Sequence, residues 1–138
     1  MSSVIPIPHY PQSREGYCLP ACARMVLAGL GLFYEETEII RILRARSFGT
    51  PFSRITRLSQ LGLGIITKQG SLEYLVSTLE AGIPVILSLR TGFLDYWDLD
   101  FRHSVVAAGF DIDSSFWIHD PALHEGPIAN SWDGLLAA

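Results

Sequence analysis

The segment Gln12–Cys22, QSREGYCLPAC, places a cysteine at the start of a predicted helix. Apolar residues recur with a helical period to about Leu30, proline is tolerated only in a first helical turn, and glycines at positions 29 and 31 supply a stop. The free amides and the dipole of a helix N-terminus stabilise a thiolate, the reactive form of cysteine. Cys18 is therefore a candidate nucleophile.

The remaining apolar periods predict further helices and then strands. Residues 4–11 are expected to be extended, because proline recurs there. We predict helices over 35–46, 53–61 and 71–81, strands over 63–68, 83–89 (a buried one), 104–110 and 115–119, a loop over 91–102, a turn over 111–114 and a capped helix over 130–138. Helices that precede strands, with consecutive strands pairing, favour an α+β fold over a doubly wound sheet.

Composition and length limit the class of protein. The 138 residues have the usual size of one domain, so residues 1–138 are predicted to form a single domain. The chain is 49% apolar and 17% charged, which is typical of a folded protein, and its formal charge of -4 gives no electrostatic basis for binding nucleic acid. The last predicted helix reads as cut short, so we expect the natural protein to continue beyond Ala138.

The two cysteines indicate a reducing compartment. Cys18 and Cys22 lie four residues apart on one predicted helix, face the same side and are awkward to bridge. No segment has the pattern of a signal peptide or the length of a membrane span. Reduced thiols and a cytosolic setting are expected. A metal site formed by the two cysteines and two histidines is a weak alternative, because the C-x-x-C spacing of zinc knuckles is missing.

A reactive thiol needs a base, and His103 is the strongest candidate among four histidines. It stands where a polar loop gives way to a predicted strand. If this strand and the next form a hairpin, Asp120 lies at the same open end, where its carboxylate can hold the imidazole. The side-chain amide of Gln12 and the backbone N–H of Cys18 can supply two donors to an oxyanion.

Each of these residues also has an ordinary structural interpretation. Cys18 can be a buried core cysteine, His103 a satisfied histidine at a strand edge, and Asp120, which precedes a proline, a turn opener. Cys22 is expected to pack in the core. His119 neighbours Asp120 in an extended segment and is expected to point the opposite way, which favours a surface or supporting role.

Three aromatic residues precede His103 in the predicted loop. Tyr96, Trp97 and Phe101 can line a peptide-binding cleft or plug the edge of the core, and the sequence favours neither interpretation. The two remaining histidines, at positions 9 and 124, suggest no role.

The order and spacing of these blocks resemble the papain-like cysteine peptidases of the bacteriocin-processing, double-glycine-leader type. The blocks are Gln12, CLPACARMVL at 18–27, SL at 71–72 leading to GIPVI at 82–86, HSVVAAGFD at 103–111 and IHDP at 118–121. The resemblance runs from Gln12 to Trp132, and the ordered set carries it rather than any one block.

The resemblance implies a papain-like α+β fold, with a helical half that carries the nucleophile and a sheet half that carries the base. Family members cut a leader peptide after two small residues, often as the cytosolic domain of a peptide-exporting ABC transporter. By this resemblance Cys18 is the nucleophile of a thioester mechanism, His103 the general base and then acid, Asp120 its orienting partner and Gln12 the oxyanion donor. A peptide or protein substrate and an ABC exporter are the implied partners, with no metal or cofactor.

One position departs from the family pattern. Leu19 stands where the family commonly has a glycine, directly after the nucleophile. A branched side chain there can crowd the substrate, change specificity or mark a lapsed enzyme. Leu19 therefore keeps open a catalytically silent peptide-binding module of the same fold. A transpeptidase of the phytochelatin-synthase kind also stays open, because access to the thioester, and not the catalytic residues, decides between hydrolysis and transfer.

Overall fold

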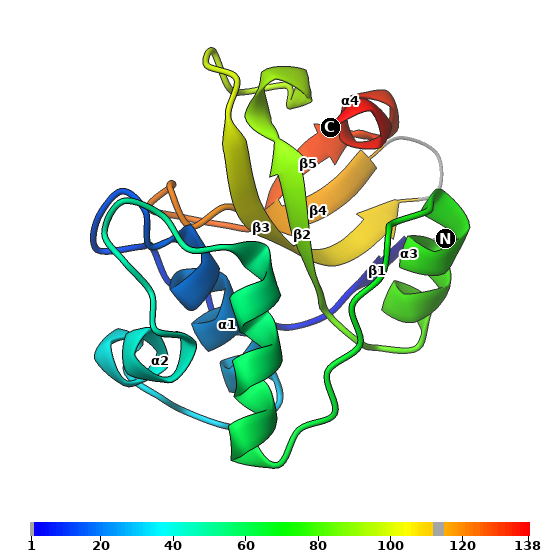
Figure 1. The fold of residues 1–138 in the computed structure, drawn as a ribbon. Coiled ribbons are helices and arrows are strands. Elements are labelled where there is room, and N and C mark those ends of the chain that lie inside the picture. Colours follow the sequence, from blue (N-terminus) through cyan, green and yellow to red (C-terminus); the bar gives the residue numbers. More distant parts are fainter. Residues whose placement is uncertain (1, 112–114) are drawn as a thin grey trace.

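The computed structural model describes residues 2–111 and 115–138, shown in Figure 1. In chain order they form β1 (Ser2–Val4), α1 (Cys18–Gly29), α2 (Glu36–Leu43), the 3-10 helix η1 (Phe52–Leu61), α3 (Leu72–Glu80), β2 (Val85–Arg90), the 3-10 turn η2 (Thr91–Phe93), β3 (Arg102–Asp111), β4 (Ser115–His119), β5 (Ile128–Ser131) and α4 (Trp132–Ala137).

The first helices form one half of the molecule. α1, α2 and η1 lie together at one side of the sheet in Figure 1. Their shared core consists of Leu19, Ala23, Leu27, Ile39, Leu43, Ile55 and Leu58. Most of these residues recur at helical spacing, so each helix turns its apolar side toward the other two. α2 and η1 therefore hold α1, the helix that begins at Cys18, through this shared core.

The sheet is antiparallel throughout and is built around β3. β4 pairs with one edge of β3 and β5 with the outer edge of β4, whereas β2 and β1 share the other edge of β3 at different ends. The long central strand is almost entirely buried. The described residues thus form the expected α+β arrangement, with a helical N-terminal half and a sheet in the C-terminal half.

Helices cover both faces of the sheet. On one face Val106 of β3 packs against Cys22 and Met25 of α1. On the other face the neighbouring residue, Ala107, belongs to a cluster with Leu79 of α3, which α4 also joins. Successive side chains of a strand point to opposite faces, so β3 joins the two layers. α1 is thereby held with its first residue near the start of β3.

Most predicted elements are confirmed with shifted ends. The helices expected at 35–46 and 71–81 are shorter, the one at 53–61 is a 3-10 helix, and the strand at 104–110 extends two residues earlier and one later. The loop at 91–102 contains the single turn η2, and Arg102 already belongs to β3. Residues 112–114 of the predicted turn lie outside the described residues.

One predicted strand is absent, and two further predictions need correction. Residues 63–68 form no strand: Ile66 is 81% exposed, and a β-branched run gains little without a neighbouring strand to pack on. The strand expected to be buried from residue 83 starts at Val85 and exposes Ser88 and Arg90. The helix expected from 130 begins at Trp132, because the preceding residues pair with β4 as β5.

Candidate active site

Cys18 is the first residue of α1 and is half-buried. The chain approaches it through Gly16, whose φ of 86° is the left-handed conformation that favours glycine. A Cβ on Gly16 would lie 2.1 Å from the carbonyl oxygen of Ser47, so only glycine fits this position. The sharp turn presents Cys18 at the N-terminus of α1, as the sequence predicts.

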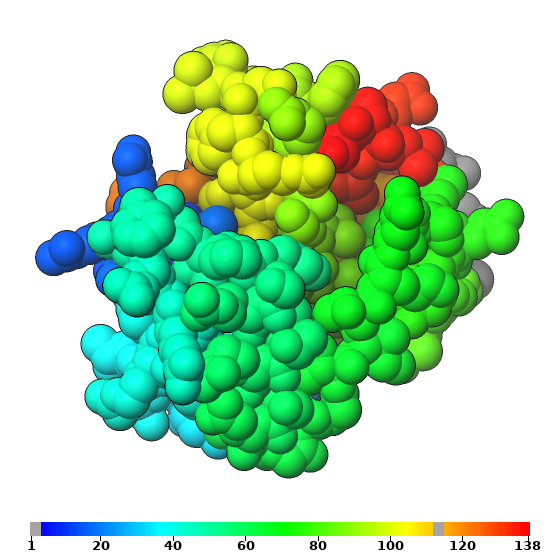
Figure 2. Space-filling view, viewed as in Figure 1, coloured from blue at the N-terminus to red at the C-terminus, as the bar shows by residue number. Residues whose placement is uncertain are grey.

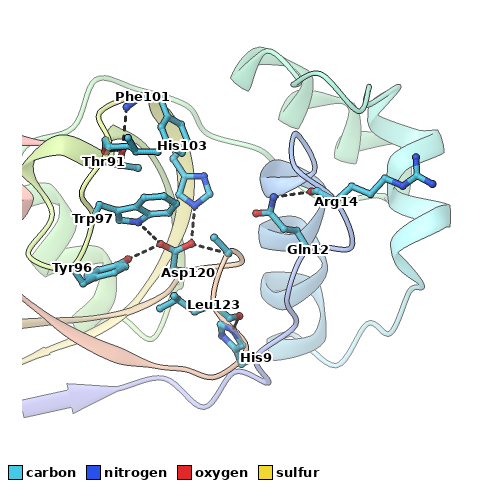
Figure 3. A network of polar contacts seen from close by, with 12 residues as sticks. His9, Gln12, Arg14, Thr91, Tyr96, Trp97, Phe101, His103, Asp120 and Leu123 are labelled. Atoms are coloured by element: carbon cyan, nitrogen blue, oxygen red, sulfur yellow. Dashed lines mark hydrogen bonds and ion pairs between the residues drawn. The ribbon is translucent and has the colours of Figure 1, made fainter.

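His103 and Asp120 meet at one end of the sheet. His103 is the second residue of β3, and Asp120 directly follows β4. His103 Nε2 and Asp120 Oδ1 are 2.7 Å apart, and both side chains are almost fully buried. Figure 3 shows the imidazole of His103 directly above the carboxylate of Asp120, with the segment that leads into α1 to the right of both. The structure therefore brings the predicted base and its predicted partner into contact.

Three further donors hold the carboxylate of Asp120. The Tyr96 hydroxyl and the Trp97 indole N–H donate to Oδ2 at 2.7 and 2.8 Å, and the backbone N–H of Ala122 donates to Oδ1 at 2.9 Å. Burial alone would raise the pKa of Asp120, but the hydrogen bond and charge of His103, with the Tyr96 and Ala122 bonds, hold this pKa below its usual value. Asp120 is thus fixed as an anion.

The loop that carries Tyr96 and Trp97 is anchored on β5. The backbone N–H of Asp95 donates to Oδ1 of the buried Asn130 at 2.8 Å, and the backbone N–H and hydroxyl of Ser131 donate to the Asp95 carboxylate. β5 was not predicted from the sequence. Through these bonds it holds the loop that binds Asp120.

The aromatic residues before His103 do more than line a cleft or plug the core. Tyr96 and Trp97 bind Asp120, and the Trp97 ring also packs edge-on against His103 with centroids 5.3 Å apart. Phe101, whose ring centroid lies 6.0 Å from that of His103, remains partly exposed. The sequence could place these residues near the base, but not their hydrogen bonds to Asp120.

Cys18 and His103 each shift the pKa of the other toward its charged form. Burial raises the pKa of the Cys18 thiol, but the hydrogen bond and charge of His103, with hydrogen bonds to Ser104, outweigh burial and lower it below the usual value. Burial likewise lowers the pKa of His103, but Asp120 and Cys18 raise it to about 9. Because Nε2 of His103 is bound to Asp120, Nδ1 is the nitrogen left for the thiol. Both shifts therefore favour the charged forms, a thiolate beside an imidazolium.

Gln12 lies beside this group without pointing its amide nitrogen into it. Gln12 Nε2 donates to the backbone oxygen of Arg14 at 2.8 Å, whereas Gln12 Oε1 is buried and has no hydrogen-bond partner among the described residues. Figure 3 shows this oxygen on the side that faces His103 and Asp120. A half-turn about the last side-chain bond would exchange the two atoms and direct the NH₂ group toward the site.

Leu19 does not enter the site. Its side chain is 1% exposed and packs in the core of the helical half, against residues such as Ala23 and Ile39. The crowding considered from the sequence is therefore absent, because the helix turns position 19 away from the sulfur of Cys18. Cys22 is likewise fully buried, and its burial together with Cys18 and Asp120 raises its pKa well above the usual value.

The other histidines divide into a buried pair and an exposed residue. His119 is buried rather than at the surface, and its ring contacts that of His9. His124 is exposed.

Within residues 2–111 and 115–138, no three His, Cys, Asp or Glu side chains are grouped to hold a metal ion. In the same residues, no helix is long and apolar enough to cross a bilayer.

Two comparisons with known proteins concern the family and the fold of the chain. The sequence profile of the Peptidase_C39 like family matches residues 4–134. A crystal structure of a candidate C39-like peptidase from Bacillus anthracis superimposes with a TM-score of 0.82 at 15% sequence identity, covering 100% of this chain and 92% of the other. At that identity the likeness concerns the fold. No curated protein sequence matches the chain significantly.

Proposed function

Because the chain belongs to the C39-like peptidase family, a family of cysteine peptidases, we propose that it cleaves peptide bonds through Cys18, His103 and Asp120. One observation carries the proposal: the buried imidazole of His103 bonds Asp120 at 2.7 Å and lowers the pKa of Cys18. A packing cysteine needs no such partner. Cys22, on the same helix, has its pKa raised instead.

The proposed reaction has two halves, the formation of a thioester on Cys18 and its hydrolysis. The Cys18 thiolate attacks the substrate carbonyl, and the backbone N–H of Cys18 with the turned amide of Gln12 stabilises the oxyanion. As the C–N bond breaks, the His103 imidazolium gives its proton to the leaving amine, which leaves a thioester on Cys18. His103 then takes a proton from water as the water attacks the thioester, and cleavage of the C–S bond restores the thiolate–imidazolium pair.

The substrate class is proposed from the resemblance. Double-glycine leader peptides, cut after two small residues, are the expected substrates, and an ABC-type peptide exporter is the expected partner. A reducing compartment such as the cytosol fits the need for a free Cys18 thiol. The position of Leu19 in the core removes the feature that favoured a catalytically silent peptide-binding module.

A product analysis tests the proposal. The protein is incubated with a mixture of peptides that includes double-glycine leader sequences, with and without hydroxylamine, and new termini are read by mass spectrometry. Hydrolysis yields free carboxylates, and interception of the thioester by the added amine yields hydroxamates. A Cys18→Ala variant should form neither. Equal product formation by this variant would exclude the mechanism, and a product that forms only with an added amine would indicate a transpeptidase.

A further inference from the structure

A pair of imidazoles lies beside the turn that carries Asp120. His9 Nδ1 and His119 Nδ1 are 2.9 Å apart, and the rings are stacked with centroids 5.2 Å apart. His9 Nε2 lies 2.7 Å from the backbone oxygen of Leu123. A Cβ on Gly126 would approach His9 Nδ1 to 2.5 Å, so the chain closes tightly around the pair. None of the steps proposed above uses these two histidines.

Hydrogen-bond chemistry fixes which atoms of the pair carry protons. The Leu123 carbonyl can only accept, so His9 carries its hydrogen on Nε2. When both rings are neutral, His9 has a bare Nδ1, so His119 must donate to it from its own Nδ1. Burial and the neighbouring His9 lower the pKa of His119 to about 4, which keeps its ring neutral near neutral pH. The geometry thus specifies one tautomer for each ring.

The pair joins two segments that both belong to the site. His119 directly precedes Asp120, and Leu123 closes the turn after it by donating its backbone N–H to the Asp120 carbonyl at 3.0 Å. On the other segment, three residues after His9, the backbone N–H of Gln12 donates to the Pro121 oxygen at 2.7 Å. Figure 3 shows His9 and Leu123 below Asp120, with the chain continuing from His9 to Gln12. His9 and Gln12 therefore bind the Asp120 turn from the same extended segment.

We propose that His9 is a positioning residue that locks the Asp120 turn to the Gln12 segment and so sets the orientation of His103. The inference rests on the proposed function, because the orientation of His103 affects catalysis only if His103 takes part in it. The effect of His9 on His103 can nevertheless be tested without a substrate. One hydrogen bond of His9 holds the side chain of His119 and the other holds the backbone oxygen of Leu123, and both partners lie within three residues of Asp120. If these bonds are lost, the carboxylate keeps its donors from the 96–97 loop but loses its fixed position relative to His103.

The test compares three variants with the parent chain. His9→Phe keeps a ring in the site and removes both hydrogen bonds, whereas His9→Gln keeps a donor that can reach the Leu123 oxygen. His124→Phe is the matched control, because His124 is exposed on the neighbouring loop. The pKa of His103 is measured by NMR titration of its ring signals, and the rate of Cys18 alkylation by iodoacetamide is measured at pH 6.

We expect His9→Phe to lower the His103 pKa from about 9 by roughly one unit and to slow alkylation about tenfold. His9→Gln should recover most of both losses, and His124→Phe should change neither. A His103 pKa unchanged by His9→Phe, with the fold intact by circular dichroism, would overturn the inference even if the parent reacts rapidly. If the parent thiol proves unreactive while His9→Phe still lowers the His103 pKa, the proposed function fails and the inference stands.

A variant that does not fold still leaves the inference testable. If His9→Phe is unfolded, His9→Asn replaces it, because this shorter side chain can accept from His119 but cannot reach the Leu123 oxygen. A His103 pKa equal to that of the parent in His9→Asn would overturn the proposal. In the parent, ¹H–¹⁵N spectra of the imidazoles should show His9 protonated on Nε2 and His119 on Nδ1; the opposite tautomers would also overturn it.

Discussion

His103 and Asp120 form a 2.7 Å hydrogen bond although the β3–β4 ladder does not pair them. The register pairs Val106 with His119, so a continued ladder would set His103 opposite a residue beyond Asp120. The bond forms because the chain leaves β4 at Asp120 and turns, which brings the carboxylate back under the imidazole. The link between base and carboxylate therefore depends on the turn at 120–123 as well as on the sheet.

Tyr96→Phe removes one donor from the Asp120 carboxylate. A hydrogen bond to a charged group contributes about 1.5–3 kcal/mol, so we expect a loss of that size in the free energy of unfolding at pH 7. The pKa of Asp120 is lowered by folding, so this stabilisation is present above the unfolded pKa of about 3.9 and fades as the pH falls through the folded value.

Urea unfolding at pH 7 and at a series of pH values below 4 measures the Tyr96 effect. Tyr74→Phe, on the exposed side of α3, is the control and should cost little at any of these pH values. A Tyr96→Phe penalty that does not shrink as the pH falls through the acid range would mean that the hydroxyl does not act on the ionised carboxylate.

Cys18→Ala and Cys22→Ala should separate chemistry from packing. Removal of the Cys18 sulfur abolishes peptide cleavage and leaves the fold intact, because that side chain is only half-buried. Cys22 is fully enclosed by Met25 and Val106, so its truncation should cost roughly 1 kcal/mol of stability while cleavage persists. Cleavage assays and thermal unfolding of both variants check this, and similar losses of activity from the two would contradict the assignment.

Gln12→Ala should lower kcat by roughly a hundredfold with a small change in KM, if the amide turns to hold the oxyanion. The buried oxygen without a partner is the structural reason to expect that this amide can turn. Gln60→Ala, on the exposed side of η1, is the control. Steady-state cleavage kinetics distinguish the two, and a Gln12→Ala enzyme with the parent kcat would remove Gln12 from the mechanism.

Leu19→Ala should destabilise the protein by about 2–5 kcal/mol without increasing the kcat of the folded fraction. The side chain fills the helical core, so its truncation leaves a cavity there and opens no room for substrate. Denaturant unfolding and cleavage assays provide the two measurements. Leu30→Ala, at the exposed end of α1, should be nearly neutral. Faster cleavage by Leu19→Ala would show that position 19 restricts the substrate after all.

Local patterns in the sequence were enough to predict the helix that begins at Cys18 and the proximity of His103 to Asp120. Pro20 and the glycines around α1 fix its ends, and the apolar runs of β3 and β4, with a short turn expected between them, mark a hairpin. These signals lie within a few residues of each other, which is why the sequence alone reveals them.

The contacts that complete the site could not be predicted in this way. The bonds from Tyr96 and Trp97 to Asp120 depend on a loop held by Asn130. The contact between His9 and His119 joins positions 110 residues apart. Neither has a local sequence pattern, because each forms only when distant segments pack. The same reason explains the false strand at 63–68, whose β-forming residues find no partner strand.

The most direct test of the central claim is the rate of Cys18 alkylation by iodoacetamide from pH 4 to 9, in the parent and in His103→Ala, with Cys22 as internal control in the same mass spectra. In the parent we predict rapid labelling well below the pKa of about 8.5 of a free thiol, and negligible labelling of the buried Cys22. In His103→Ala the transition should move to or above that pKa, because burial of Cys18 then acts with less opposition. Parent labelling that follows an ordinary thiol, or a curve that His103→Ala leaves unchanged, would contradict an activated Cys18–His103 pair.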